Sequence, residues 1–179
     1  MKNKVALLIK PNKFEIETHK IDKLEKNYVL VKIHKTGVCG SDLHYFRHGG
    51  LGSFKSKMPL SLGHEASGII IDKNNTNLKN NSKVIIDPLN HACCPNSKKN
   101  NPHICEIWKD KVNICNNGTY LGTNPTPGTF REYIHLHKSQ LTICNDIKYL
   151  IIRIYLSHSE LLCMLLIKQK LITHVKITF

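Results

Sequence analysis

The sequence lacks several features that would each fix a class of protein. No GxGxxG turn occurs in its 179 residues, so no glycine-rich cradle for a dinucleotide is expected within it. No apolar run reaches the length of a membrane span uninterrupted: the most apolar stretch, YLIIRIYLSHSELLCMLLI, contains Arg153, His158 and Glu160. The amino-terminal VALLI is too short for a signal peptide. We therefore expect a cytoplasmic chain with no membrane partner.

Acidic residues are also scarce. The chain has 13 Asp and Glu against 26 Lys and Arg, which gives a formal net charge of +13. Such an excess raises the question of a nucleic-acid partner. However, the lysines are scattered among asparagines, as in NNTNLKNNSK, and are not gathered in a basic helix or between aromatic residues. The distribution favours a solvated surface, and we expect no nucleic acid to bind.

The seven cysteines are odd in number and unevenly spaced. This pattern indicates a reducing compartment with metal-bound and free thiols, not a disulfide framework. A length of 179 residues and an apolar content of 41% suit one domain with an appendage. A second large domain does not fit in the sequence.

Hydrophobic alternation predicts a mainly β protein with long loops, more like a barrel than a sandwich. The pattern VALLIK, PNK, FEIETHKI predicts a hairpin turned at Pro11 and Asn12, and period-two alternation predicts a strand at 28–36. Further strands are expected in GIIIDK, in KVIIDP and over 128–136. A short helical turn capped by Ser41 or Asp42 is expected in the loop that follows residue 36.

The last 35 residues differ from the rest, since 145–179 contain no glycine and no proline. Ser157 with Glu160 three residues later forms a capping-box signature before an apolar run. This pattern predicts a helix over about 158–171, followed by a strand in THVKITF.

Potential metal ligands gather in the loops between residues 37 and 68. Cys39, flanked by Gly37 and Gly40, supplies a sulfur ligand, and His64 and Glu65 supply a nitrogen and an oxygen. Three protein ligands leave a zinc ion one open position, which is typical of catalysis. The residues alone leave another interpretation open, namely a buried thiol, a structural histidine and a surface carboxylate.

The segment TGVCGSDLHYFRHGGLGSFKSKMPLSLGHEASG resembles the catalytic-zinc region of the zinc-dependent medium-chain alcohol and polyol dehydrogenases, in the branch of sorbitol dehydrogenase and L-idonate 5-dehydrogenase. The elements GxCGSDxHYxxxG and LGHE carry the resemblance, which extends to about Cys144. It implies a GroES-like, partly open β-barrel as catalytic domain over 1–144, with 145–179 as a divergent, partly helical tail. The cofactors it implies are zinc and NAD or NADP.

The resemblance also assigns roles to single residues. It implies that Cys39, His64 and Glu65 are the ligands of the catalytic zinc. Ser41 corresponds to the hydroxyl of a proton relay, and His44 to the histidine that passes the proton on. Tyr45 corresponds to an aromatic residue that lines the substrate pocket.

A second, structural zinc lobe of the family is altered in this chain. The family spacing C-x2-C-x2-C-x7-C falls on His91, Cys94, Ser97 and Cys105 in HACCPNSKKNNPHIC. Serine is a poor zinc ligand, so we expect the lobe, about 91–115, to be degenerate and empty. Substitution by Cys93 or His103 through a shift of the loop is the alternative.

These observations predict a truncated dehydrogenase that lacks the Rossmann domain of its family. Its family reaction is oxidation of a secondary alcohol of a polyol or sugar acid to a ketone with NAD or NADP. Because the cofactor cradle is missing, we expect little or no activity from the chain alone. A non-catalytic zinc-binding or interaction module is the alternative, and the sequence leaves the oligomeric state open.

Overall fold

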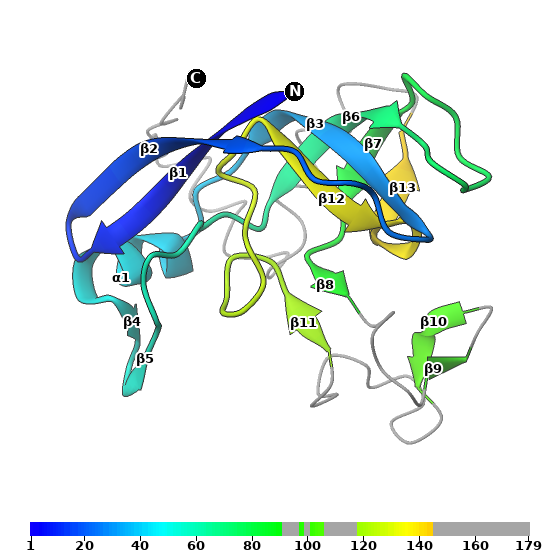
Figure 1. Ribbon diagram of the computed structural model, residues 1–179. Coiled ribbons are helices and arrows are strands. Elements are labelled where there is room, and N and C mark those ends of the chain that lie inside the picture. The colour runs from blue at the N-terminus through cyan, green and yellow to red at the C-terminus, as the bar shows by residue number, and fades with distance from the viewer. Residues whose placement is uncertain (91–96, 99–100, 106–117, 145–179) are drawn as a thin grey trace, which may run out of the picture.

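The computed structural model describes residues 1–90, 97–98, 101–105 and 118–144 (Figure 1). This part of the chain is mainly β, as predicted, with a single α-helix. The strands and the helix follow in the order β1 (Lys2–Lys10), β2 (Lys13–Lys20), β3 (Tyr28–Thr36), α1 (Gly40–His48), β4 (Gly50–Leu51), β5 (Phe54–Lys55), β6 (Ala66–Asp72), β7 (Lys83–Ile86), β8 (Leu89–Asn90), β9 (Ser97–Lys98), β10 (Asn101–Cys105), β11 (Thr119–Tyr120), β12 (Tyr133–His137) and β13 (Leu141–Ile143). A 3₁₀ turn, Lys138–Gln140, joins the last two strands.

The hairpin predicted at Pro11 and Asn12 is confirmed. Strands β1 and β2 pair antiparallel down to Lys10 opposite Lys13. Asn12 has a φ of 64°, a left-handed conformation that asparagine tolerates better than most residues. Every residue of β2 is exposed, whereas β1 is buried along Val5–Leu8. The hairpin therefore contacts the rest of the protein mainly through β1.

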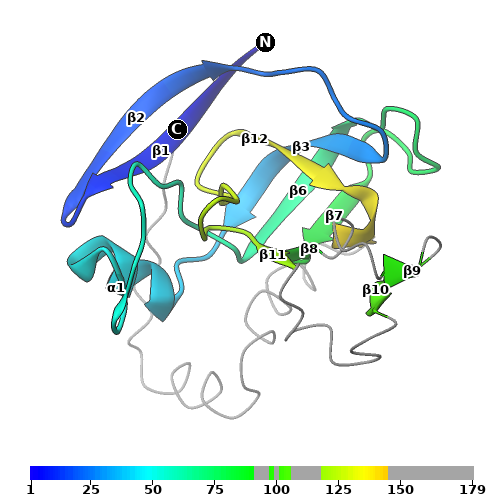
Figure 2. The same ribbon diagram turned by 60° about the horizontal axis from the view of Figure 1, so that its bottom comes forward.

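Five strands form the main sheet, in the order β12-β3-β6-β7-β13, and all neighbours are antiparallel. The pairing of β3 with β6 shifts register twice, between Leu30 and Val31 and between Ile33 and Lys35. Such irregularities bend a strand and increase its twist, and the sheet curls into a half-barrel (Figures 1 and 2). The hairpin of β1 and β2 lies beside it, and isolated bridges join Val5 to Arg131 and Leu8 to Leu60.

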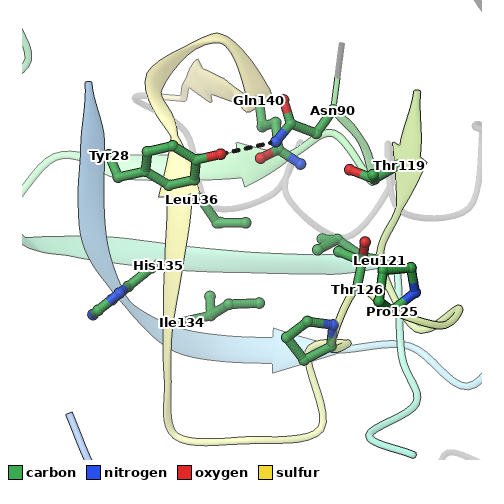
Figure 3. Close-up of a pocket in the computed structure, with 11 residues that line it drawn as sticks. Tyr28, Asn90, Thr119, Leu121, Pro125, Thr126, Ile134, His135, Leu136 and Gln140 are labelled. Carbon is green, nitrogen blue, oxygen red and sulfur yellow. Dashed lines mark hydrogen bonds between the residues drawn. The ribbon is translucent and has the colours of Figure 1, made fainter. Parts of the chain in front are cut away.

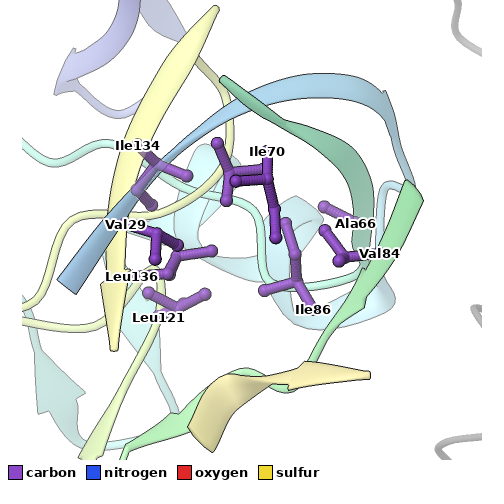
Figure 4. Packing of buried hydrophobic residues seen from close by; sticks show 9 residues of the cluster. Val29, Ala66, Ile70, Val84, Ile86, Leu121, Ile134 and Leu136 are labelled. Atoms are coloured by element: carbon purple, nitrogen blue, oxygen red, sulfur yellow. The ribbon is translucent and has the colours of Figure 1, made fainter. Parts of the chain in front are cut away.

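The described part of the chain contains two buried apolar clusters. The first lies inside the curled sheet and consists of side chains from its strands together with Leu121 (Figure 4). The second lies between β1 and α1, and its members are Ala6, Leu8, Tyr45, Leu60, Leu62 and Phe130. Leu8 and Leu62 are fully buried in this second cluster. The second cluster therefore packs both α1 and the 60–62 segment against the barrel.

Two local predictions are wrong. The strand expected over 128–136 begins only at Tyr133, because the preceding backbone pairs elsewhere: Phe130 N–H donates to Leu62 O at 3.0 Å. Neither Ser41 nor Asp42 is the N-cap residue of the helix. It begins at Gly40 with Cys39 as N-cap, in an extended conformation.

Other predictions fall outside the described residues. These are the helix over 158–171, the strand in THVKITF, and the placement of His91 and Cys94. Within the described ranges, no helix has both the length and the apolar character needed to cross a bilayer.

A hydroxyl pair joins the end of β3 to the loop before β12. Thr36 Oγ1 lies 2.8 Å from Thr129 Oγ1, and Thr129 is fully buried. We expect Thr36→Val to lower the free energy of unfolding by about 1–2 kcal/mol, because the Thr129 hydroxyl loses its partner. Urea unfolding measures the loss, with the exposed Thr18→Val as the neutral control. The double variant with Thr129→Val should cost less than the two single changes summed; strict additivity would refute the pair.

Candidate metal centre

The first candidate ligand stands at the start of helix α1. Cys39, the N-cap, has φ −78° and ψ 159°. Its backbone N–H donates to Asp42 Oδ2 at 2.9 Å. A carboxylate at the third position of a helix accepts from an N–H that has no partner inside the helix. Its negative charge is also stabilised by the positive end of the helix dipole. This contact fixes the loop that carries the Cys39 thiol.

The other two candidate ligands, His64 and Glu65, lie just before β6. Gly63 precedes them with a φ of 91°, a conformation that favours glycine. Its N–H donates to Asp42 Oδ1 at 3.1 Å, and its carbonyl accepts from Thr129 N–H at 2.9 Å. Asp42 thus ties the Cys39 loop to the His64 loop across 21 residues of sequence.

The structure brings the three predicted ligands together. One ligand atom from each of Cys39, His64 and Glu65 lies within 4.8 Å of the others. Donors on one tetrahedral zinc ion are about 3.3–3.6 Å apart, given bond lengths of about 2.0–2.3 Å. Side-chain adjustments of about 1 Å would therefore close the set around an ion. His64 is buried, while Cys39 and Glu65 are half-buried, so the centre opens toward solvent on one side.

The electrostatics of the cluster suit a cation. A hydrogen bond with His64 lowers the pKa of the Cys39 thiol, although burial acts in the opposite direction. Contacts with Ser41 lower that pKa further. Burial lowers the pKa of His64, but the neighbouring Asp42 and Cys39 side chains outweigh it and raise the pKa to about 10. A metal ion would displace this proton, since only neutral imidazole coordinates.

Asp42 and Tyr120 also belong to the centre, although the sequence predicted neither of them as part of it. Asp42 is 4% exposed, and its Oδ1 lies 3.7 Å from His64 Nδ1, which leaves Nε2 as the nitrogen available to a metal. Asp42 stands three residues after Cys39, which the structure shows to be the N-cap, and a carboxylate at that spacing is typical of a capping box. The Tyr120 ring lies 5.5 Å from the His64 ring, and burial, with the charge of Cys39 next, raises its pKa to about 12.

The three residues predicted to act in proton transfer and substrate contact all lie on α1. Ser41 is half-buried in its first turn, beside Cys39. His44 is exposed. Tyr45 is 4% exposed and packs in the second apolar cluster, where burial raises its pKa. The described contacts of Tyr45 are thus those of a core residue, and its role at a substrate pocket stays a prediction.

Of the four positions of the predicted structural lobe, only Ser97 and Cys105 lie within the described residues. Ser97 and Cys105 pair through their backbones in β9 and β10, while His91 and Cys94 lie outside the described residues.

A separate pocket of about 300 Å³ lies on the main sheet (Figure 3). Its lining includes Leu121, Pro125, Ile134 and Leu136, and a hydrogen bond of 3.3 Å joins Asn90 Nδ2 to the Tyr28 hydroxyl (Figure 3). No candidate metal ligand lines this pocket. This pocket and the metal centre are therefore distinct.

Comparison with known proteins identifies the family of the chain. Residues 25–146 match the family of the alcohol dehydrogenase GroES-like domain. The chain is 33% identical to sorbitol dehydrogenase of Mus musculus over 135 residues, which cover 68% of this chain and 38% of that protein. It is 36% identical to D-xylulose reductase A of Aspergillus oryzae over 126 residues, which cover 68% and 32%.

Among solved structures, L-idonate 5-dehydrogenase from Escherichia coli superposes with a TM-score of 0.66 at 28% identity, covering 80% of this chain and 40% of that one. The predicted GroES-like fold and the resemblance to zinc-dependent dehydrogenases are thus confirmed. The chain spans well under half the length of these relatives.

Proposed function

Because this chain belongs to the alcohol dehydrogenase GroES-like domain family, we propose that it is the zinc-binding part of an NAD- or NADP-dependent dehydrogenase. The substrate class is a polyol or sugar acid of the sorbitol or L-idonate type, with a secondary alcohol oxidised to a ketone. One observation carries the proposal: a thiol, an imidazole and a carboxylate from two loops converge within 4.8 Å. Relatives named as sorbitol dehydrogenase and D-xylulose reductase support the substrate class.

Zinc binding and the positioning of the zinc ligands are proposed to fall to different residues of this chain. Cys39, His64 and Glu65 would hold the zinc, which supplies Lewis-acid activation of the substrate hydroxyl. Asp42 orients His64 through Nδ1 and fixes the backbone under both ligand loops.

Proton transfer falls to the first two turns of α1. Ser41 is half-buried next to Cys39, and His44 follows three residues later on an adjoining part of the helix surface. Since His44 is exposed, it can release to solvent a proton received from the Ser41 hydroxyl. Tyr45 is proposed to line the substrate pocket with the part of its ring that is not packed in the second apolar cluster.

The 179 residues by themselves are proposed to turn over little or no substrate. Hydride transfer requires a nicotinamide held beside the alcohol, and the sequence has no GxGxxG to hold its pyrophosphate. Incubation of pure chain with sorbitol or L-idonate and either nicotinamide cofactor should give no rise in absorbance of the reduced cofactor. Measurable oxidation of either substrate would contradict the proposal that these 179 residues alone turn over little or no substrate.

Metal analysis tests the zinc site itself. The purified chain is expected to hold zinc, and Cys39→Ala should remove one equivalent, as should Glu65→Gln at least in part. Cys144→Ala is the matched control, because Cys144 is half-buried but outside the cluster. Circular dichroism checks that each variant folds. Zinc that is retained in Cys39→Ala but lost in Cys94→Ala or Cys105→Ala would favour the alternative, a non-catalytic zinc-binding module.

A further inference from the structure

Helix α1 carries two histidines that the metal centre does not use. His44 and His48 are four residues apart and therefore lie on the same face of the helix, one turn from each other. Both are exposed, and their ring centroids lie 5.9 Å apart with the ring planes inclined at 42°. Neither belongs to the cluster of Cys39, His64 and Glu65.

The rest of the helix holds this face toward solvent. Tyr45 is buried in the second apolar cluster, and the Phe46 ring stacks on Phe14 of β2 at 5.4 Å with an interplanar angle of 6°. Phe46 O accepts from Asn12 N–H at 2.7 Å. Figures 1 and 2 show α1 below the β1–β2 hairpin, at one end of the molecule. These contacts fix the helix about its axis, so the two histidines stay on its exposed face.

The spacing of the two rings suits a shared metal ion. An imidazole nitrogen lies about 2.0–2.1 Å from a bound zinc ion, which puts the ring centroid about 3.2 Å from the metal. Two rings on one ion then have centroids about 5.2 Å apart at a tetrahedral angle, and at most about 6.4 Å apart. The separation of 5.9 Å falls inside this range. The separation of the two rings is therefore compatible with one shared ion.

We propose that His44 and His48 chelate a divalent transition-metal ion of the Ni²⁺, Cu²⁺ or Zn²⁺ type at a second, exposed site on α1. Imidazole nitrogen suits these ions, and His48 is the last residue of the helix, where the dipole favours a cation. Two nearby positive charges would repel a bound cation. They belong to Arg47, in the same turn, and to Lys55, whose Nζ donates to His48 O at 3.1 Å. The site therefore binds more weakly than the Cys39 centre. It does not depend on the proposed function, although a metal ion on His44 would compete with the proton transfer proposed for that residue.

Calorimetric titration of the zinc-loaded full chain with Ni²⁺ tests the proposal. Loss of groups that merely hydrogen-bond to a ligand weakens metal binding by about 10–100-fold, so His44→Gln and His48→Gln should each weaken Ni²⁺ binding by at least about 10-fold. His34→Gln is the matched control, because His34 is exposed on β3. Cys39→Ala should leave this Ni²⁺ equivalent in place.

Two results would overturn the second site: unchanged Ni²⁺ affinity in the variant that combines His44→Gln with His48→Gln, or loss of the Ni²⁺ equivalent in Cys39→Ala. Both histidines are exposed, so melting temperatures of their variants should match the parent chain and show that folding is intact. A second measurement uses the unaltered chain. Electron paramagnetic resonance of bound Cu²⁺ should show coupling to two imidazole nitrogens, and a spectrum without nitrogen coupling would contradict the chelate.

Discussion

Replacing Gly128 with alanine is expected to cost about 4 kcal/mol or more of the free energy of unfolding, a loss typical of severe steric conflict. The reason is backbone contact. A Cβ atom on Gly128 would overlap the carbonyl group of Leu62 and the carbonyl oxygen of Gly63. Neither is the movable end of a side chain, so two main-chain segments would have to separate.

That separation would break several interactions at once. Gly128 N–H donates to Ser61 O at 2.9 Å, and the next two residues donate to Gly63 O and Leu62 O. The 61–63 segment leads directly into His64 and Glu65, so its displacement would also spoil the metal centre. Urea unfolding followed by circular dichroism measures the stability, and metal analysis of the same sample is expected to show zinc loss.

Gly40→Ala is the matched control for this prediction. Nothing lies within 4 Å of a Cβ built on Gly40, which is the first residue of α1. Alanine favours helix over glycine by up to about 1 kcal/mol, so this variant should be neutral or slightly more stable. If Gly128→Ala unfolds at the same urea concentration as Gly40→Ala, the close packing of residues 128–130 against 61–63 is wrong.

Short-range patterns predicted the β architecture well. The hairpin at Pro11 and Asn12 and the strand at 28–36 rest on local alternation and turn chemistry, and both occur as expected. The strand expected over 128–136 was wrong at its start, because residues 128–132 pair with β1 and with the 61–63 segment. These partners lie far away in sequence, and no periodicity within the strand reveals them.

In the candidate site too, local patterns identified some residues, whereas others are brought in only by long-range contacts of the fold. Residue type and spacing picked out Cys39, His64 and Glu65, and the fold places them together. Tyr120 could not be found in this way, because its contact with His64 depends on the path of a chain segment more than 50 residues downstream. Asp42 was considered only as a helix cap. Its second bond, to Gly63, is a tertiary contact that a helix signal does not contain.

Asp42→Ala is expected to cost about 3–5 kcal/mol, because it leaves two N–H groups without an acceptor and removes a buried charge partner. The two donors are Cys39 N–H, at 2.9 Å, and Gly63 N–H, at 3.1 Å. His64 also loses the carboxylate that lies 3.7 Å from Nδ1. Zinc affinity should fall by about 10–100-fold, as for other groups that orient a metal ligand.

Asp42→Asn separates the two effects of the carboxylate. Asparagine keeps the shape but has one acceptor oxygen, so its amide group must face one of the two N–H donors. We expect Asp42→Asn to recover part of the stability lost in Asp42→Ala while zinc affinity stays low, because the charge next to His64 is gone. Asp72→Asn is the control: Asp72 is exposed, and its bond from Asn74 N–H suits an amide oxygen equally well. Full zinc affinity in Asp42→Asn would show that Asp42 supports the backbone alone and does not orient His64.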